Sequence, residues 1–188
     1  MVQIRLTKNQ VAVVDEIDDA AILALGSWCC NASGYAVHYY TDANDKPKML
    51  NMHRLVMERI LGTPIPPSLQ VDHISRETDG ILARLNNRRA NLRLATRSQN
   101  QANKGRSVNN TSAYKGVSFN RGKWEARIKY DGRRLHLGRF EDPVIAAMMY
   151  DAATRVLNQA FAGTNFVTQN TPPSLEEQVR RLLAQHGL

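Results

Sequence analysis

A polar stretch at residues 101–113 limits the architecture of this chain more than any other feature of its sequence. The stretch reads QANKGRSVNNTSA, is rich in Asn and Ser, and has neither helical nor strand periodicity, which is the composition of a linker. The chain has 188 residues, enough for two small domains. We therefore expect a strand-rich lead-in at residues 1–50, a second segment at 51–103, a linker at 104–111, a domain at 112–168 and a C-terminal helix at 169–188.

Short strands and helices are predicted before this linker. Val, Ile and Leu dominate residues 2–14 on both sides of a Lys-Asn-Gln turn, which predicts two strands. A short helical stretch with acidic residues in its first turn then ends at Gly26, and two further strand-like runs follow it. Residues 52–61 have apolar side chains at helical spacing and stop at Gly62. Residues 69–74, LQVDHI, are typical of a strand.

Three strands and a helix are predicted after the linker. The strand candidates are YKGVSFN, KWEARIKY and RRLHLGRF, and the Asp131-Gly132 pair between the last two is a strong hairpin signal. A helix follows, with Asp142 at its N-cap and Pro143 in its first position. The fold class we expect is α+β, with a three-stranded antiparallel sheet packed on one helix. The helix face expected to pack on the sheet carries Val144, Ala147, Met148, Ala152 and Val156.

The basic charge is concentrated in the middle of the chain. Residues 71–140 contain 16 Lys and Arg against 5 Asp and Glu, whereas the rest of the chain contains 9 against 12. Because aromatic residues are interleaved with this charge, a nucleic-acid backbone is the expected partner. A membrane is not expected, since no apolar run approaches the roughly 20 residues that span a bilayer and no signal-peptide pattern begins the sequence. We expect a cytoplasmic protein of a bacterium or a phage-infected cell.

Asp72 and His73 suggest hydrolytic chemistry at the end of the strand at residues 69–74. Consecutive strand residues point to opposite sides, so one side chain can hold a metal ion while the other faces a water. Hydrolysis of a phosphodiester needs a base for the water and a cation for the charge that develops on the phosphate. One carboxylate and one amide oxygen, completed by waters, suit Mg²⁺. Zinc is disfavoured, because the cysteines are the adjacent pair Cys29 and Cys30.

The stretches VDHI and LNNRRANLRLATRSQN resemble the HNH homing-endonuclease family. Its ββα-metal site is built from a strand with Asp-His, a loop Asn and a helix with a last Asn or His. The resemblance implies that His73 is the general base and that Asn91 orients it through its side-chain carbonyl. It also implies that Asp72 and Asn100 bind Mg²⁺ or Mn²⁺. The remaining amides are assigned to turns and the linker: Asn86, Asn87 and Asn103.

Five arginines around this motif are expected to contact DNA phosphates: Arg54, Arg88, Arg89, Arg93 and Arg97. His53, next to the first of them, is given a supporting or DNA-contacting role. One stretch departs from the family pattern, because SRETDGILAR stands where a shorter turn is usual. An insertion of this size costs little free energy, so we expect the two ends of the loop to keep their geometry.

Residues 112–167 are similar to the Apetala-two / ethylene-response-factor DNA-binding domain, through YKGVSF, KWEARI, LHLGRF, the Ala-rich helix with Tyr-Asp, and a closing Asn-Phe. The resemblance implies that the sheet enters the major groove, which is about 12 Å wide. Ser118 and His136 replace the Arg and Trp of the plant pattern, so sequence preference does not carry over. Trp124 either packs on the helix or touches DNA, whereas Gly116, Gly138 and Tyr150 are fold residues. The expected DNA contacts are Lys115, Ser118, Arg121, Lys123, Trp124, Arg127, Arg134 and His136.

Together these patterns predict a metal-dependent HNH DNA endonuclease of the homing or mobile-element type, held on double-stranded DNA by its C-terminal domain. One active site per chain predicts nicking by a monomer, or double-strand cleavage by a homodimer. Two alternatives stay open. One is a DNA-binding regulator with a degenerate nuclease segment, since His after a strand is often structural and Asn clusters often mark turns. The other is an RNA-binding protein, although no aromatic pair typical of RNA recognition is present.

Overall fold

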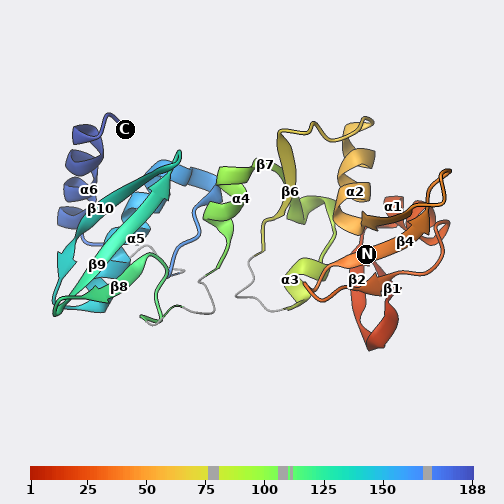
Figure 1. Ribbon diagram of the computed structural model, residues 1–188, viewed down its shortest axis with the longest axis horizontal. Helices are drawn as coiled ribbons and strands as arrows, with labels where there is room; N and C mark the ends of the chain where they lie inside the picture. Colours follow the sequence, from red (N-terminus) through yellow and green to blue (C-terminus); the bar gives the residue numbers. More distant parts are fainter. Residues whose placement is uncertain (76–80, 106–109, 111, 167–170) are drawn as a thin grey trace. The chain divides into compact units, whose positions relative to one another are not determined.

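A computed structural model describes residues 1–75, 81–105, 110, 112–166 and 171–188 of the chain (Figure 1). The chain separates into two compact units, Met1–Arg97 and Ser98–Leu188. Both contain helices and small antiparallel sheets, which confirms the predicted α+β class. Among the described residues, no helix combines the length and the apolar character that a bilayer crossing requires.

The first unit begins with the strand-rich lead-in that the sequence predicts. Strands β1 (Val2–Arg5) and β2 (Val11–Val14) form an antiparallel pair, and helix α1 (Glu16–Leu23) follows. A three-stranded antiparallel sheet comes next, formed by β3 (Cys29–Cys30), β4 (Ala36–Thr41) and β5 (Pro47–Asn51). Helix α2 (Met52–Leu61) then ends at Gly62, whose φ of 69° is the left-handed conformation that favours glycine.

Strand β6 (Leu69–His73), also predicted, pairs antiparallel with β7 (Leu92–Thr96). The chain between them contains helix α3 (Ile81–Leu85) and a 3-10 helix, η3 (Arg89–Asn91). Helix α3 begins inside the stretch SRETDGILAR, which was expected to form a loop, and ends one residue beyond it. Residues 76–80 of that stretch are outside the described residues.

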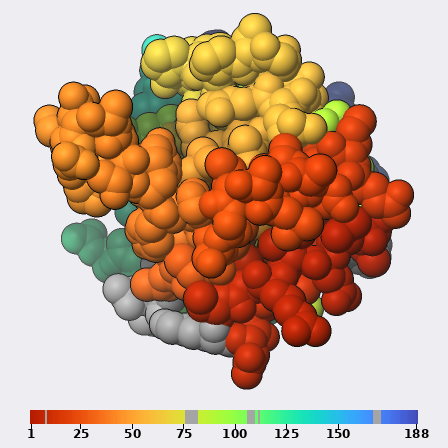
Figure 2. Space-filling view, turned by 90° about the vertical axis from the view of Figure 1, so that its right-hand side faces the viewer, coloured from red at the N-terminus to blue at the C-terminus, as the bar shows by residue number. Residues whose placement is uncertain are grey.

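One hydrophobic core joins the lead-in to strand β6, which carries Asp72 and His73. Its fully buried members include Val14 from β2, Ile22 from α1, Val56 from α2 and Leu85 from α3. Figure 2 shows the same relation at the surface, where the red and orange atoms of the lead-in lie against the yellow atoms of the residues that follow. The lead-in is therefore packed as part of the first unit rather than appended to it.

The second unit contains the predicted three-stranded sheet packed on one helix. Helix α4 (Arg97–Asn103) starts at the boundary, and strands β8 (Val117–Asn120), β9 (Lys123–Tyr130) and β10 (Arg133–Phe140) form an antiparallel sheet in the order β10-β9-β8. Asp131 and Gly132 both have positive φ, as a two-residue hairpin turn requires. Helix α5 (Pro143–Asn158) covers one face of the sheet, and η4 (Gln159–Phe161) and α6 (Pro173–Gln185) follow.

Helix α5 starts as predicted but buries a wider face than predicted. The Asp142 carboxylate accepts a hydrogen bond from the Val144 amide at 2.7 Å, and Pro143 occupies the first turn. Val156, expected on the buried face, is 48% exposed, whereas Met149 and Ala153 are fully buried. The reason is that α5 packs against both the sheet and α6, so a single stripe of residues does not describe its contacts.

Candidate active site and nucleic-acid interface

Asp72 and His73 are both buried at the end of β6, with 5% and 8% of their surfaces exposed. Arg93 is the register partner of Asp72 on β7, and its Nη2 lies 2.8 Å from Asp72 Oδ2. His73 instead contacts residues from α2 and from the segment that precedes η3. The two side chains therefore lie in different surroundings, as alternation along a strand predicts.

Asn87 holds the His73 ring. His73 Nε2 lies 3.1 Å from Asn87 Oδ1, and Asn87 Nδ2 donates to the Leu85 carbonyl at 3.2 Å and to Met52 Sδ at 3.4 Å. The donating amide nitrogen fixes which end of the Asn87 side chain faces the ring. Because an amide oxygen only accepts, Nε2 must carry the ring hydrogen, which places the lone pair of a neutral imidazole on Nδ1.

Asn91, which the resemblance assigned to this contact, has different partners. Its Oδ1 accepts hydrogen bonds from Ser75 N at 2.9 Å and Ser75 Oγ at 2.8 Å, and its Nδ2 donates to the Asn86 carbonyl at 2.7 Å. Asn91 therefore ties the chain after β6 to the chain before β7. The sequence could not distinguish the two amides, because both stand in the same polar run of Asn and Arg.

His53 and Tyr35 complete the surroundings of His73. The His53 ring stands edge-on to His73 at a centroid distance of 5.2 Å, and the Tyr35 ring lies at 6.0 Å. Burial lowers the pKa of His53 to about 3, with a further contribution from the nearby His73. Burial also lowers the pKa of His73 below its usual 6.5, although the Asn87 hydrogen bond and the Asp72 charge oppose this. Both rings are therefore neutral near neutral pH.

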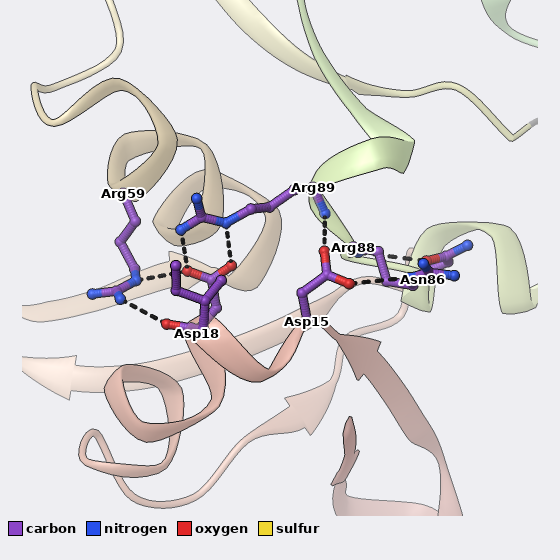
Figure 3. A network of polar contacts seen from close by, with 7 residues as sticks. Asp15, Asp18, Arg59, Asn86, Arg88 and Arg89 are labelled. Atoms are coloured by element: carbon purple, nitrogen blue, oxygen red, sulfur yellow. Dashed lines mark hydrogen bonds and ion pairs between the residues drawn. The ribbon is translucent and has the colours of Figure 1, made fainter. Parts of the chain in front are cut away.

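Two of the arginines predicted to contact DNA are engaged with carboxylates of the lead-in (Figure 3). Arg89 donates to Asp18 through Nε at 2.7 Å and Nη2 at 2.8 Å, and Arg59 donates to the same carboxylate at 2.8 Å. Asp15 accepts from the Arg89 backbone amide at 2.9 Å and from Arg88 Nε at 3.2 Å. Asp18 is completely buried, and the Arg89 hydrogen bond is the main reason that its pKa is lowered.

The other predicted residues near the motif have varied positions. Arg54 lies on α2, half-exposed, 3.7 Å from Glu58, and Arg97 is exposed at the start of α4. Asn100, the second predicted metal ligand, is half-buried on α4 and belongs to the second unit. The residues that the first unit itself brings together are Asp72, His73, Asn87 and Asn91, with Arg93 on the carboxylate.

Asp72 offers a carboxylate and Asn100 an amide oxygen, which are donor types that a hard, oxygen-binding cation prefers, and the two residues belong to different units. One carboxylate and one amide oxygen leave most of the coordination shell to waters and substrate phosphate, which is the usual arrangement for Mg²⁺. The described residues contain no group of three His, Cys, Asp or Glu side chains that could hold a metal ion. The predicted pair would not form such a group, because it has two residues and one of them, Asn100, offers an amide oxygen.

The outward face of the second unit's sheet is strongly basic. Arg127 pairs with His136 across β9 and β10, Lys129 pairs with Arg134, and all four residues are exposed. Ser118 is exposed on the neighbouring β8. Lys129 was absent from the predicted contacts, although its position two residues after Arg127 on a strand would have indicated it.

Glu125 and Arg139 are two further residues of this face that the sequence analysis missed. Glu125 is buried and contacts Arg127 and Arg139, the latter at 3.4 Å. Arg139 reaches this face because the β9–β10 register shifts between His136 and Gly138. Simple alternation would have placed Arg139 on the opposite face. Because the sequence does not reveal the bulge, the position of Arg139 could not be predicted from it.

Other predicted contacts of the second unit have structural partners. Lys115 Nζ donates to the carbonyls of Ala102 at 2.5 Å and Lys104 at 2.6 Å. Trp124 is half-buried and packs against the hydrophobic core, with its ring 4.9 Å from that of Phe119, which agrees with the packing alternative for this residue.

Two more of these predicted contacts lie in or beside the β8–β9 turn. Arg121 occupies the turn with a positive φ of 48°, and Lys123 pairs with exposed Glu141 at 2.8 Å.

The residues expected to serve the fold of the second unit have that role. An added Cβ at Gly116 would lie 2.0 Å from the Tyr150 ring, and the φ of Gly116 is +76°. Gly138 stands at the bulge of β10, where a Cβ would lie 2.8 Å from the Phe140 ring. These close approaches require glycine, so the prediction for Gly116, Gly138 and Tyr150 is confirmed.

Comparisons with known proteins agree on one family. Residues 51–102 match a family model described as HNH endonuclease. An uncharacterized HNH endonuclease of Acanthamoeba polyphaga mimivirus is 32% identical over 149 residues, which cover 79% of this chain and 72% of the relative. Because 149 residues exceed the length of either compact unit, the similarity includes residues of both.

Proposed function

The chain belongs to the HNH endonuclease family, a family of phosphodiester hydrolases, and from this premise we propose that it is a metal-dependent endonuclease of the homing or mobile-element type that cleaves DNA. The observation that carries the proposal is the buried Asp72-His73 pair, in which Asn87 holds the His73 ring while Arg93 holds the carboxylate. A histidine that is neutral, oriented and next to a carboxylate is suited to general-base catalysis.

The chain's own residues have distinct roles in the proposed hydrolysis. His73 Nδ1 takes the proton of the attacking water, because the contact with Asn87 leaves the lone pair on that nitrogen. Asn91 keeps the chain on both sides of His73 in place through Ser75 and Asn86. Asp72 and Asn100 would hold Mg²⁺ or Mn²⁺, as in the ββα-metal site, and the ion would neutralise charge on the scissile phosphate.

The second unit is proposed to bind double-stranded DNA through the outward face of its sheet, in the manner of an Apetala-two-type domain. Arg127, Arg134 and His136 lie exposed on neighbouring strands of this face, and Ser118 lies on β8. Such residues supply phosphate affinity, and the sheet's width suits the major groove. Arg97, exposed at the start of α4, is a further candidate for a phosphate contact.

The proposal is tested by conversion of supercoiled plasmid with Mg²⁺, comparing the wild-type chain with His73→Ala. We expect the wild type to produce nicked or linear DNA, the metal chelator EDTA to stop it, and the variant to be inactive while still binding duplex DNA. Cleavage that survives His73→Ala would refute the assignment of the base. Binding without cleavage by the wild type would favour a DNA-binding regulator, and preference for RNA over duplex DNA at equal salt would favour an RNA-binding protein.

A further inference from the structure

The segment at residues 86–91 carries both amides of the site, and the N-terminal lead-in holds this segment. The Asn87 backbone amide donates to the Val13 carbonyl at 2.8 Å, and Val13 and Asn86 form a parallel β-bridge. Strand β2 is thus paired, through Val13, with the segment whose Asn87 side chain contacts His73. A displacement of this segment relative to β2 would therefore move Asn87 and the ring that it holds.

A second attachment acts on the same segment from α1. Asp18 is completely buried and accepts three hydrogen bonds, two from Arg89 and one from Arg59 on α2. Asp15 accepts from the backbone amide of Arg89 and from Arg88. Figure 3 shows the two carboxylates on one side of the segment, each facing an arginine of residues 88–89. Arg89 lies two residues from Asn87 and two from Asn91, so this attachment is centred between the two amides.

The geometry of the Arg89 contact is specific to a guanidinium. Nε and Nη2 of Arg89 bind different oxygens of Asp18, at 2.7 and 2.8 Å. A contact of this kind fixes the direction as well as the position of the arginine. A lysine would keep the positive charge but could not bind both oxygens at the same time with the same geometry.

We propose that Asp15 and Asp18 are positioning residues of the nuclease site, which act through Arg89 to set residues 86–91 and thereby hold Asn87 on the His73 ring. Arg89 is accordingly a positioning residue and not a phosphate contact. The inference rests on the proposed function, because it assumes that His73 is the base. It assigns part of the catalytic geometry to the lead-in, which lies outside the residues that match the family model.

The decisive variant is Arg89→Lys in the full chain, with Asp18→Asn as its partner. The matched control is Arg181→Lys, because Arg181 also pairs with a carboxylate, Glu177, but on the exposed surface of α6. A phosphate contact tolerates lysine, whereas the two-point contact with Asp18 does not. We expect Arg89→Lys to lower kcat by on the order of tenfold to a hundredfold, since small misplacements of catalytic groups have effects of this size. Duplex DNA affinity, measured in EDTA, should stay within about twofold of the wild type and keep its salt dependence. The reason is that Arg89, bound to Asp18, contributes no phosphate contact that the substitution could remove.

A structural readout separates positioning from a general loss of folding. The ¹⁵N resonances of the His73 ring report which nitrogen carries the hydrogen, and we expect Nε2–H in the wild type and a mixture of tautomers in Arg89→Lys and Asp18→Asn. Circular dichroism checks that each variant is folded. If Asp18→Asn does not fold, the Arg89→Lys variant alone tests the positioning role.

Three results would overturn the inference. They are an unchanged kcat in a folded Arg89→Lys, a loss of DNA affinity that accounts for the loss of cleavage, and a His73 tautomer that both variants leave unaltered. The proposed function fails separately, through cleavage by His73→Ala, and that result is independent of the three above.

Discussion

The arginines of the two units differ in what surrounds them. In the first unit, Arg93 and Arg89 are 17% and 32% exposed, and their guanidinium groups lie on buried carboxylates. In the second unit, Arg134 is exposed on a sheet face that it shares with Lys129 and His136. Charge counted along the sequence is therefore of two kinds. One kind is paired with buried carboxylates of the first unit, and the other is exposed to solvent on the sheet of the second unit.

The histidines show the same contrast. His73 is buried, the neighbouring His53 is half-buried, and both have lowered pKa values, whereas His136 is exposed on the basic face of β10. Residue type alone does not distinguish these two environments. The difference lies in desolvation, which is decided by the elements packed around each ring.

The largest effect is expected when one histidine of each unit is replaced by alanine. His73→Ala should lower the cleavage rate by about 10²–10⁴-fold, the usual contribution of a general base, while leaving DNA affinity unchanged. His136→Ala is the matched control and should weaken DNA binding with little change in the rate at saturating DNA. Rates from plasmid cleavage and affinities from fluorescence anisotropy measure the two effects. Equal losses of rate in both variants would contradict the division between the regions.

The next largest effect concerns the glycine that lets the sheet approach α5. Gly116→Ala places a Cβ 2.0 Å from the Tyr150 ring, whereas Gly122→Ala meets nothing within 4 Å, and both glycines have positive φ. The two substitutions share the backbone strain, so their difference isolates the steric clash. We expect Gly116→Ala to cost about 1–3 kcal/mol more in free energy of unfolding, measured by urea denaturation. Equal losses would show that the ring moves aside.

A pH effect of intermediate size should arise in the first unit. The pKa of His53 is about 3 in the folded chain and near 6.5 when unfolded. Between these values the unfolded chain binds the extra proton, so stability is full above pH 6.5 and falls as the pH drops towards 3, by up to about 1.4 kcal/mol per pH unit.

Replacement of His53 tests this pH dependence. Denaturation of His53→Gln between pH 7 and 4 should show a flatter dependence than the wild type. His186→Gln, at the exposed C-terminal end, is the control that should leave it unchanged. A wild-type stability that does not fall in this range would contradict the buried, neutral state of His53.

The smallest effect is expected for single arginines of the exposed sheet. Arg134→Ala should weaken DNA binding at all sequences and reduce the slope of log affinity against log salt by about 1, as the loss of one phosphate contact requires. Arg88→Ala is the comparison, since Arg88 Nε lies on Asp15, and its slope should be unchanged. A reduced slope for Arg88→Ala would place that arginine on DNA and break the contrast.

Much of the architecture follows from local signals. The α2 stop at Gly62, the Asp131-Gly132 turn and the Asp142-Pro143 start of α5 were all predicted, because each depends on the backbone preferences of one or two residues. The buried face of α5 was predicted only in part, since Ala147 and Ala152 are buried but Val156 is exposed, and helix α3 was not predicted. Both depend on packing against elements distant in sequence, which periodicity does not report.

The sequence by itself determined the Asp-His pair at the end of a strand, the basic middle of the chain and the three-stranded sheet with its helix. Only the tertiary structure decided that Asn87 contacts the ring, that Asn91 closes the loop on Ser75, and that Arg89 faces Asp18. The physical reason is that a motif specifies residue types and spacing, whereas a hydrogen bond depends on direction and distance within about 3 Å. In this chain those directions are set by the N-terminal lead-in, through contacts that span more than seventy residues of sequence.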